Sequence, residues 1–401
     1  NAILSIVNQA NDKEICKKIF GNELAIVPYI MPGFDLSKKA LEIFEKNSQV
    51  KGLILLNHGI FTFGNTAKES YERMIKYVSL AENELRKKSK KTIITKYNEK
   101  KISSSKLSNI FRKYLSISSN DDFERKIIYH SNPSFINYFF NKEIYSKING
   151  PVTPDHVIRI KHKTLFLDFS KIKNLNLENE INKKINKYKN NYINYFNRNK
   201  HLNKKAKMHD PIPKLIVVKG VGLFSVGKTF KDAKIAMDVG TNSLSVTMNS
   251  FKYGKFKSIS EKEIFRMEYW PLELAKISSS NLPLQGNVTV ITGGLGTIGY
   301  TTALKFLKEG SEVVLLDNKI NNKNINGMTF FKCDVTNSNQ IKKVLNKISN
   351  KFGGVDIIIS NAGFAIQSSL KDINKLILDK SFSINFFAHH FLAQQTVEIL
   401  K

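Results

Sequence analysis

Three glycines at a regular spacing, Gly293, Gly296 and Gly299, form the pattern in this sequence best suited to binding a phosphate-bearing cofactor. They follow a β-branched run, 288–292, and precede a segment whose apolar residues have helical spacing. In such a turn the first glycine permits the bend, and the second lets backbone N–H groups approach a pyrophosphate. The third lets the helix pack closely on the strand. The pattern therefore predicts a strand, a glycine turn and a helix that bind a dinucleotide.

A carboxylate stands at the end of the next predicted strand, 312–317. Asp317 is placed to accept hydrogen bonds from the adenosine ribose hydroxyls, which favours NAD over NADP. No arginine follows to hold a 2′-phosphate, although Lys319 lies two residues further on. A glycine turn in some other α/β protein is the competing interpretation.

A histidine near the other end of the chain has a second arrangement suited to chemistry. His58 follows a predicted buried strand over 52–56, and a further extended segment is predicted over 60–63. An imidazole at a strand end beside a glycine suits metal binding, but a single histidine is more often structural. Thr66 is expected to cap the following helix. The predicted apolar stripe of that helix consists of Tyr71, Met74, Ile75, Val78 and Ala81.

The segment around His58 recurs 163 residues later in the chain. Gly222 corresponds to Gly59, and four further identities follow: Phe61 with Phe224, Gly64 with Gly227, Thr66 with Thr229 and Lys68 with Lys231. Val221 occupies the position of His58, so the second copy lacks the candidate metal ligand. We interpret this as a duplicated fold whose second copy lost its metal; coincidence between two buried strand-turn-helix segments is the alternative.

Charge is concentrated in one region. The 401 residues contain 63 Lys and Arg against 34 Asp and Glu, a formal charge of +29, of which +20 lies within 86–207. Such an excess makes nucleic acid the first partner to consider. The region is rich in Lys, Asn and Ile but poor in Arg, the usual fork for bases and phosphates. We therefore attribute the charge to biased composition on a solvated surface and do not expect a nucleic-acid partner.

The cysteines and the apolar segments indicate in which cellular compartment the protein is expected. Cys16 and Cys333 lie far apart without a CxxC pair, which argues against a disulfide scaffold and a cysteine-built zinc site. No secretory signal opens the sequence, and no apolar run approaches the roughly 18 residues needed to span a bilayer. We expect a cytoplasmic protein without a membrane partner.

The C-terminal region resembles the short-chain dehydrogenase/reductase family. TGGLGTIG is similar to that family's glycine turn, and SFSINFF to its helical segment with a proton-relay asparagine. The resemblance implies that Asp334, followed by Val335, contacts the adenine, and that Asn385 is the catalytic asparagine. The implied cofactor-binding residues are Gly293, Gly296, Thr297, Ile298, Gly299, Asp317, Asp334, Val335, Asn361, Ala362 and Gly363.

The family's catalytic Tyr-x-x-x-Lys motif should follow, but no tyrosine occurs after Tyr300. We therefore expect the chain to be cut at this end, with weak NAD binding at best and no turnover. The N-terminal segments PYIMPGFDL and NHGIFTFG resemble the end of a class II (zinc) sugar-phosphate aldolase domain. This second resemblance implies that His58 is the third zinc histidine and that the other ligands precede the chain.

Taken in order, the segments resemble the rhamnulose-1-phosphate aldolase/alcohol dehydrogenase family, in which a class II aldolase is fused to a short-chain dehydrogenase. The resemblance implies zinc-dependent retro-aldol cleavage of a deoxyketose 1-phosphate to dihydroxyacetone phosphate and lactaldehyde. NAD-dependent oxidoreduction of the aldehyde or alcohol product would follow. The family also implies a small-molecule sugar phosphate or aldehyde substrate and a homo-oligomer.

The predicted fold class is α/β: a class II aldolase-like α/β region followed by an incomplete Rossmann-type, doubly wound parallel sheet. The predicted domains are 1–90, the end of an aldolase-like domain; 91–283, a degenerate second aldolase-like region with a basic insertion; and 284–401, the NAD-binding half of a dehydrogenase domain. Two alternatives stay open. One is an NAD-dependent dehydrogenase with a non-catalytic aldolase-like scaffold, and the other is a basic nucleic-acid-binding protein.

Three further polar or aromatic segments are less specific. The clusters around Lys161 (with Asp155, His156 and Arg159) and around His209 and Asp210 could line an anionic-substrate cleft, but loop and turn roles are favoured. Trp270 is expected to lie in an interdomain packing segment.

Overall fold

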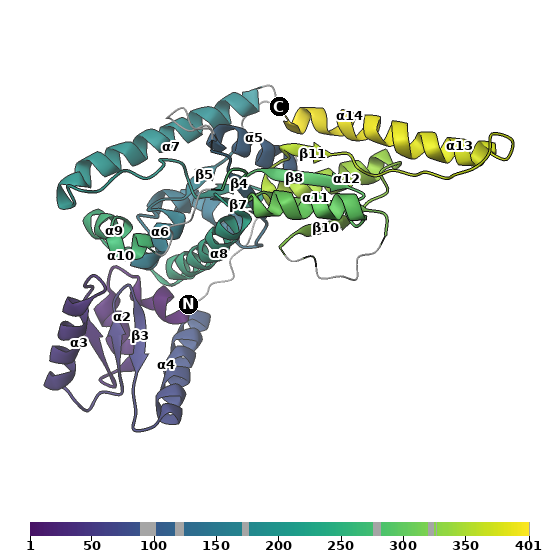
Figure 1. The fold of residues 1–401 in the computed structure, drawn as a ribbon. Coiled ribbons are helices and arrows are strands. Elements are labelled where there is room, and N and C mark those ends of the chain that lie inside the picture. The colour runs from purple at the N-terminus through teal and green to yellow at the C-terminus, as the bar shows by residue number, and fades with distance from the viewer. Residues whose placement is uncertain are drawn as a thin grey trace.

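The computed structural model describes residues 1–88, 102–116, 124–170, 176–275, 282–319, 325 and 327–400. These residues form three sheets, and we call the parts that contain them the first unit (1–88), the second unit (102–275) and the third unit (282–400). In Figure 1 the second unit lies between the first, in purple, and the third, in green to yellow. No helix within the described ranges is both long and apolar enough to cross a membrane.

The first unit is a three-stranded sheet with helices. Strand β1 pairs in parallel with β2, and β2 pairs antiparallel with β3. The Ala2 to Lys88 elements are α1 Ala2–Val7, α2 Asp12–Phe20, β1 Leu24–Val27, α3 Phe34–Lys46, β2 Gly52–Leu55, β3 Gly59–Thr62 and α4 Ala67–Lys88. The two strands and the helix predicted around His58 are thus present, with small shifts of their ends.

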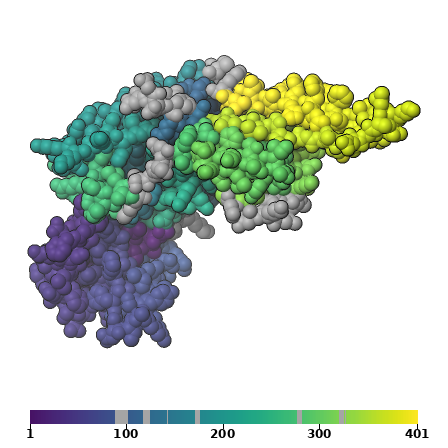
Figure 2. All heavy atoms as spheres, in the orientation of Figure 1, coloured from purple at the N-terminus to yellow at the C-terminus, as the bar shows by residue number. Residues whose placement is uncertain are grey.

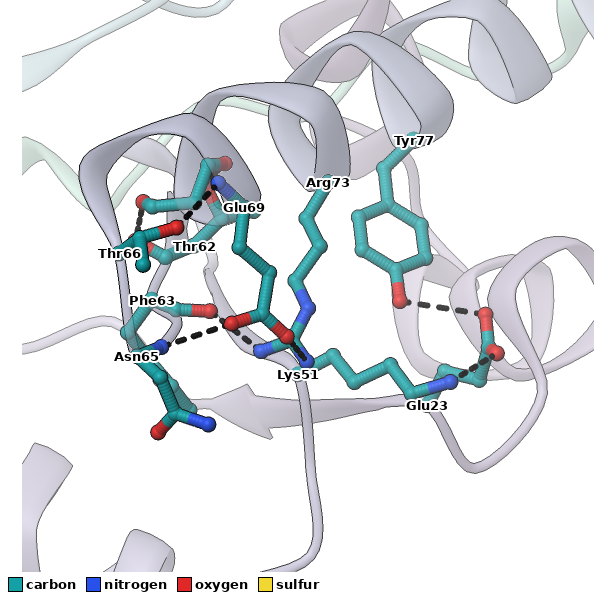
Figure 3. Close-up of polar contacts among 10 residues, drawn as sticks. Glu23, Lys51, Thr62, Phe63, Asn65, Thr66, Glu69, Arg73 and Tyr77 are labelled. Carbon is teal, nitrogen blue, oxygen red and sulfur yellow. Dashed lines mark hydrogen bonds and ion pairs between the residues drawn. The ribbon is translucent and has the colours of Figure 1, made fainter.

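The predicted apolar stripe of α4 is wrong in two positions. Tyr71 and Ile75 are exposed, whereas the predicted Ala81 is fully buried, as is Tyr77, which was not predicted. The buried face is set by tertiary contacts, because the Tyr77 ring packs edge-on against Phe20 and its hydroxyl donates to Glu23. Figure 3 shows the hydrogen bond between Tyr77 and Glu23 and the start of α4, where the Thr66 hydroxyl accepts from the Glu69 N–H at 3.1 Å. The predicted Thr66 cap is therefore present.

The second unit contains a four-stranded sheet of order β4-β7-β6-β5. Its elements before the hairpin are α5 Ser104–Ser116, β4 Ile127–Ser131, η1 Ile136–Lys147, η2 Pro154–His156, α6 Val157–Ile160, β5 Leu165–Leu167, α7 Leu177–Asn199 and η4 Lys200–Leu202. The hairpin and the helices after it are β6 Leu215–Val218, β7 Gly222–Gly227, α8 Phe230–Tyr253, α9 Glu261–Glu268 and α10 Pro271–Leu274.

The two hairpins share one register. Leu55 pairs with Gly59 in the first, and Val218 pairs with Gly222 in the second, at the positions that the sequence repeat predicts. The glycines have the same backbone conformation, with φ of 137° at Gly59 and 139° at Gly222. Each hairpin also has a parallel neighbour, β1 or β5, on the same side. The repeat is thus a repeat of structure as well as of sequence.

The third unit confirms the predicted doubly wound parallel sheet. Its strands run in the order β10-β9-β8-β11, and all pairs are parallel. The chain winds outward from β8 to β10 and then returns to place β11 on the other side of β8, which makes a topological switch point between β8 and β11. The elements are β8 Val288–Thr292, α11 Thr297–Lys308, β9 Glu312–Asp317, β10 Thr329–Lys332, α12 Ser338–Phe352 and β11 Ile357–Ile359.

Two helices and a π-helical turn complete the third unit: α13 Lys375–Phe382, η6 Ser383–Phe387 and α14 Ala388–Leu400. Figure 2 shows these segments, in yellow, projecting from one end of the molecule. Helix α12 packs against α14 within the third unit and against α5 and β4 of the second unit. Ile127 of β4 belongs to the same buried core as Ile348 and Phe352 of α12, so the second and third units share a hydrophobic core.

Candidate functional site

A cleft of about 650 Å³ lies at the carboxyl ends of β8, β9, β10 and β11. All eleven residues predicted to bind the cofactor line this cleft, together with Leu295, Leu316, Asn318, Lys319, Cys333, Phe364, Lys380 and Ile384. The cleft includes the switch point of the sheet, which is where open α/β sheets bind ligands. The structure therefore brings together residues that are spread over 71 positions of the sequence, from Gly293 to Gly363.

The glycine turn has no room for side chains. Gly293 has φ of 60°, a left-handed conformation that favours glycine. A Cβ atom on Gly299 would lie 2.4 Å from the Gly293 carbonyl oxygen, so the third glycine is what allows the helix to approach the turn. Helix α11 begins at Thr297, directly after Gly296, and its free N–H groups face the cleft end of the strands.

The carboxylate of Asp317 braces this turn. Its Oδ2 accepts a hydrogen bond from the Leu295 N–H at 3.1 Å, and its Oδ1 accepts from the Lys319 N–H at 3.1 Å. An ionised carboxylate offers about four acceptor positions, so two remain for a ribose diol. Asp334 is held similarly, because its Oδ1 accepts from both the N–H and the hydroxyl of Thr336.

Asn361 connects β11 to the glycine turn. Its amide nitrogen donates to the Thr292 carbonyl at 3.0 Å and to the Gly293 carbonyl at 3.3 Å. The Thr292 hydroxyl in turn accepts from the backbone N–H groups of Asn361 and Ala362. Thr292 was missed in the sequence, where the only signal was a hydroxyl at the end of a buried strand.

Asn385 is exposed and contacts a lining residue of the cleft without lining the cleft itself. It belongs to the π-helical turn 383–387, a distortion that is frequent at functional sites. Its side chain clasps the backbone of Phe364, accepting from the N–H at 2.8 Å and donating to the carbonyl at 2.7 Å. Phe364 lines the cleft, and the ammonium of Lys380 lies 4.2 Å from its ring centroid. Asn385 thus supports the cleft through Phe364, and its catalytic role stays a prediction.

His58 lies in the first unit, away from this cleft. Its Nε2 is 3.0 Å from the Ile30 carbonyl oxygen, and its ring stacks on Tyr29 at 5.3 Å. No group of three His, Cys, Asp or Glu side chains that could hold a metal occurs in the described parts of the chain. Because zinc needs three or four protein ligands, the described residues do not fit a zinc site.

Lys161 and His209 contact a buried network around Glu268, while Asp155, His156 and Arg159 lie in the short helices η2 and α6, and the Asp210 side chain is exposed. The carboxylate of Glu268 accepts from the hydroxyls of Tyr192 and Tyr195. The Lys161 ammonium donates to the Asp210 carbonyl and lies 3.6 Å from the Tyr192 ring centroid. Burial lowers the pKa of Lys161 to about 7, and burial raises the pKa of Glu268. The adjoining cavity of about 20 Å³ has room for one water molecule.

Trp270 packs beside this network. It lies against the aromatic core of the second unit, and so do Tyr29 and Met31 of the first unit. The expected interdomain packing segment is therefore present, and it faces the first unit.

Comparison with protein families agrees with this architecture. Residues 3–85 match the family described as class II aldolase and adducin N-terminal domain, residues 102–277 match the second domain of class II aldolases, and residues 287–401 match the short chain dehydrogenases. The fold is thus mixed α/β, with class II aldolase domains followed by a Rossmann-like short-chain dehydrogenase domain, as the sequence predicted.

Individual proteins extend the comparison. The chain is 26% identical over 399 residues to an uncharacterized oxidoreductase of Bacillus subtilis, YuxG, covering 93% of this chain and 58% of that protein. It is 31% identical over 125 residues to (+)-borneol dehydrogenase 1 of Salvia officinalis, covering 29% of this chain and 48% of that enzyme. The aldohexose dehydrogenase of Thermoplasma acidophilum is 23% identical, with a TM-score of 0.27 and coverage of 28% of this chain and 44% of that one.

Proposed function

We propose that this chain is part of a bifunctional sugar-catabolic enzyme. Its aldolase half would cleave a deoxyketose 1-phosphate similar to rhamnulose 1-phosphate, and its dehydrogenase half would use NAD to oxidise or reduce the aldehyde or alcohol product. Since the chain spans 58% of YuxG and 48% of the borneol dehydrogenase, the activity of the whole protein is part of this proposal. The observation that supports the dehydrogenase half is the gathering of all eleven predicted cofactor residues in one cleft.

The residues present fit a dinucleotide. The N–H groups at the start of α11 would bind the pyrophosphate, and the free acceptor positions of Asp317 would bind the adenosine ribose. Asp334 and Val335 would lie against the adenine, while Asn361 would hold the glycine turn in place. When bound, NAD accepts or supplies the hydride. Phe364, held by Asn385, would shape the end of the cleft beyond Gly363.

A cofactor-binding measurement on this chain tests the dehydrogenase half. We expect NAD to bind at least about 10-fold more tightly than NADP, because a 2′-phosphate would meet the Asp317 carboxylate. Asp317→Ala should weaken NAD binding about 10-fold, the value of one or two hydrogen bonds to a charged acceptor. Calorimetry, or ligand-observed NMR if binding is weak, provides the dissociation constants.

Asp379→Ala is the matched control, since Asp379 is an exposed carboxylate of α13 outside the cleft lining. It should leave both dissociation constants within about 2-fold. Absence of NAD binding to the unaltered chain, or an unchanged NAD affinity in Asp317→Ala, would contradict the proposed cofactor site.

The aldolase half rests on His58 and on the domain matches. We propose that His58 supplies one ligand of a zinc site in the whole protein. The whole protein should release dihydroxyacetone phosphate from rhamnulose 1-phosphate, and His58→Ala should reduce that rate by about 100-fold or more. A coupled assay for dihydroxyacetone phosphate measures this.

The second candidate is an NAD-dependent dehydrogenase in which the aldolase-like part is a non-catalytic scaffold. It is favoured by one observation, namely that the described residues contain no set of three ligands around His58. A whole protein without aldolase activity, but with NAD-dependent turnover, would establish this candidate instead.

We further propose a cytoplasmic homo-oligomer with no nucleic-acid or membrane partner, and the domain boundaries at 90 and 283 stay predictions. Sedimentation reports the oligomeric state. DNA binding that weakens steeply with salt would contradict the expectation about nucleic acid, because released counterions produce that slope.

A further inference from the structure

The second unit contacts the dehydrogenase sheet at the amino-terminal ends of its strands, opposite the cofactor cleft. Four strands whose carboxyl ends carry cleft residues begin there, and the second unit contacts the starts of three of them: β8, β9 and β11. At the start of β9, the Glu312 carboxylate accepts from the backbone N–H of Phe230 in α8 at 2.6 Å. The starts of β8 and β11 are held by an arginine of α5. The aldolase part therefore contacts the starts of three of the four strands that end in the cleft.

That arginine, Arg112, is buried and makes three strong contacts. Its Nη2 donates to Asp356 Oδ2 and to the Gly286 carbonyl, both at 2.7 Å, and its Nε donates to the Lys126 carbonyl at 2.8 Å. The side chains of Arg112 and Asp356 are only 7% and 5% exposed. A buried ion pair of this kind is costly to break from one side, because the remaining charge stays buried without a partner.

Asp356 also forms hydrogen bonds with the first residue of strand β8. Its Oδ2 also accepts from the backbone N–H of Val288, the first residue of β8, at 2.7 Å. Its own backbone N–H donates to the Val288 carbonyl at 3.0 Å. One carboxylate oxygen therefore binds both the arginine of the second unit and the first residue of the central strand.

Strand β11 is short and lies at the edge of the described sheet, with Ile358 and Ile359 packed against two of the buried cores. It has three half-buried residues, Ile357–Ile359, and within the described sheet it pairs with β8 alone. Asp356 directly precedes the strand. Asn361 follows its carboxyl end and donates hydrogen bonds to the Thr292 and Gly293 carbonyls. Because only four residues separate Asp356 from Asn361, we expect a shift of Asp356 to displace Asn361.

We propose that Arg112 is a positioning residue of the dinucleotide site: through Asp356 it holds β11 in place and so sets the position of Asn361 beside the glycine turn. This inference rests on the proposed NAD site. It makes the second aldolase domain a working part of the dehydrogenase, in addition to any chemistry of its own.

The chain contains a matched control on the same carboxylate. Arg125 Nε lies 3.2 Å from Asp356 Oδ1, but this side chain is 39% exposed. An ion pair whose cation is partly exposed contributes less than a fully buried one, because water and salt screen it. Loss of Arg125 removes one positive charge next to Asp356 without removing the buried contacts to Gly286 and Lys126.

The first experiment measures NAD binding by calorimetry for Arg112→Met, Arg112→Lys and Arg125→Met. We expect the dissociation constant to rise about 10-fold in Arg112→Met, less in Arg112→Lys, and no more than about 2-fold in Arg125→Met. A merely structural role would lower the fraction of folded protein, which reduces the binding stoichiometry and leaves the dissociation constant unchanged. That result in Arg112→Met would overturn the proposal.

The second experiment needs no cofactor. Amide hydrogen exchange of the three variants should show about 10-fold faster exchange at Asn361 and Ala362 in Arg112→Met, since both N–H groups bond to the Thr292 hydroxyl. Exchange in β10 should change much less, and Arg125→Met should resemble the unaltered chain. Uniformly faster exchange throughout the third unit would overturn the inference. Failure of the unaltered chain to bind NAD would contradict the proposed function alone, because the exchange pattern still judges Arg112.

Discussion

The hairpins of the first and second units have the same register but different surroundings. In the second, β7 is covered along its outer edge by β4, and the turn is filled by Asn137, which accepts from the Gly220 N–H, and by His130, whose Nε2 lies 3.3 Å from the Val221 carbonyl oxygen. In the first, β3 is the last strand of the described sheet, and Phe61 is 61% exposed. The two hairpins thus have the same backbone, and the side chains around each turn determine whether a ligand could bind there.

The two copies share their backbone and differ chiefly in the residue at the turn, His58 or Val221. His58 has an imidazole where Val221 has an isopropyl group, and the second turn is occupied by side chains of its own unit. The second copy is therefore a packed structural element, and three paired substitutions test this difference.

The largest effect is expected at the paired glycines. Gly59 and Gly222 have nearly the same φ, but a Cβ on Gly222 would lie 2.5 Å from the Ser131 carbonyl oxygen, whereas a Cβ on Gly59 meets nothing within 4 Å. Gly222→Ala should cost about 4 kcal/mol, from backbone strain and overpacking, and Gly59→Ala about 2 kcal/mol, from strain alone. Hydrogen exchange in each hairpin measures both, and equal costs would contradict the difference in surroundings.

The next effect concerns two lysines at corresponding positions, Lys51 and Lys214. Burial lowers the pKa of Lys214 to about 8, and Lys126 lowers it further, while Asp210, Asp232 and Glu124 oppose the shift. Between about pH 8 and the unfolded value near 10.5, the unfolded chain binds more protons, so stability rises with pH. The lowered pKa of Lys161, about 7, also makes stability rise with pH, and it does so equally in every variant that retains Lys161.

Lys214→Met should therefore remove a gain of up to about 1 kcal/mol per pH unit between pH 8 and 9.5. Denaturation of the second unit at several pH values measures the slope. Lys51→Met is the control: it breaks only a half-exposed ion pair with Glu23, which is worth less than about 1 kcal/mol. A slope unchanged by Lys214→Met would show that this ammonium is solvated.

The smallest effect is expected at the paired helix caps. The hydroxyls of Thr66 and Thr229 accept from the N–H groups of Glu69 and Asp232, each at 3.1 Å. Either Thr→Ala change should cost about 1 kcal/mol. The cost should be slightly larger at Thr229, which is the less exposed of the two. Thr→Ser at each position should restore most of the loss, and a cap without measurable value in only one unit would break the equivalence of the copies.

Much of the fold follows from local patterns, and the cofactor residues illustrate why. The run 288–292, the three glycines and Asp317 lie close together in sequence, so strand, turn and carboxylate were all predicted in place. The stripe of α4 was predicted wrongly at Tyr71 and Ile75, because these residues fit the helical period as well as the buried Tyr77 does. Only contacts with Phe20 and Glu23 choose between them.

The missed residues share a physical cause. Arg112 stands 244 positions from Asp356, in a region whose many charges looked like a solvated surface. A buried ion pair between distant segments has no periodicity or local motif, so no pattern reveals it. The network around Lys161 and Glu268 was missed for the same reason, since its partners come from α7, α9 and two loops.

The sequence by itself determined the class of each domain, the glycine turn, Asp317 and the repeat of the hairpin, because these depend on residues close together in the chain or on identical local spacing. Tertiary structure alone decided which face of α4 is buried and that side chains of the second unit occupy the turn between β6 and β7. It also decided that the second unit binds the amino-terminal ends of the dehydrogenase strands. Those features depend on the low-dielectric, close-packed contacts that form only when distant segments meet.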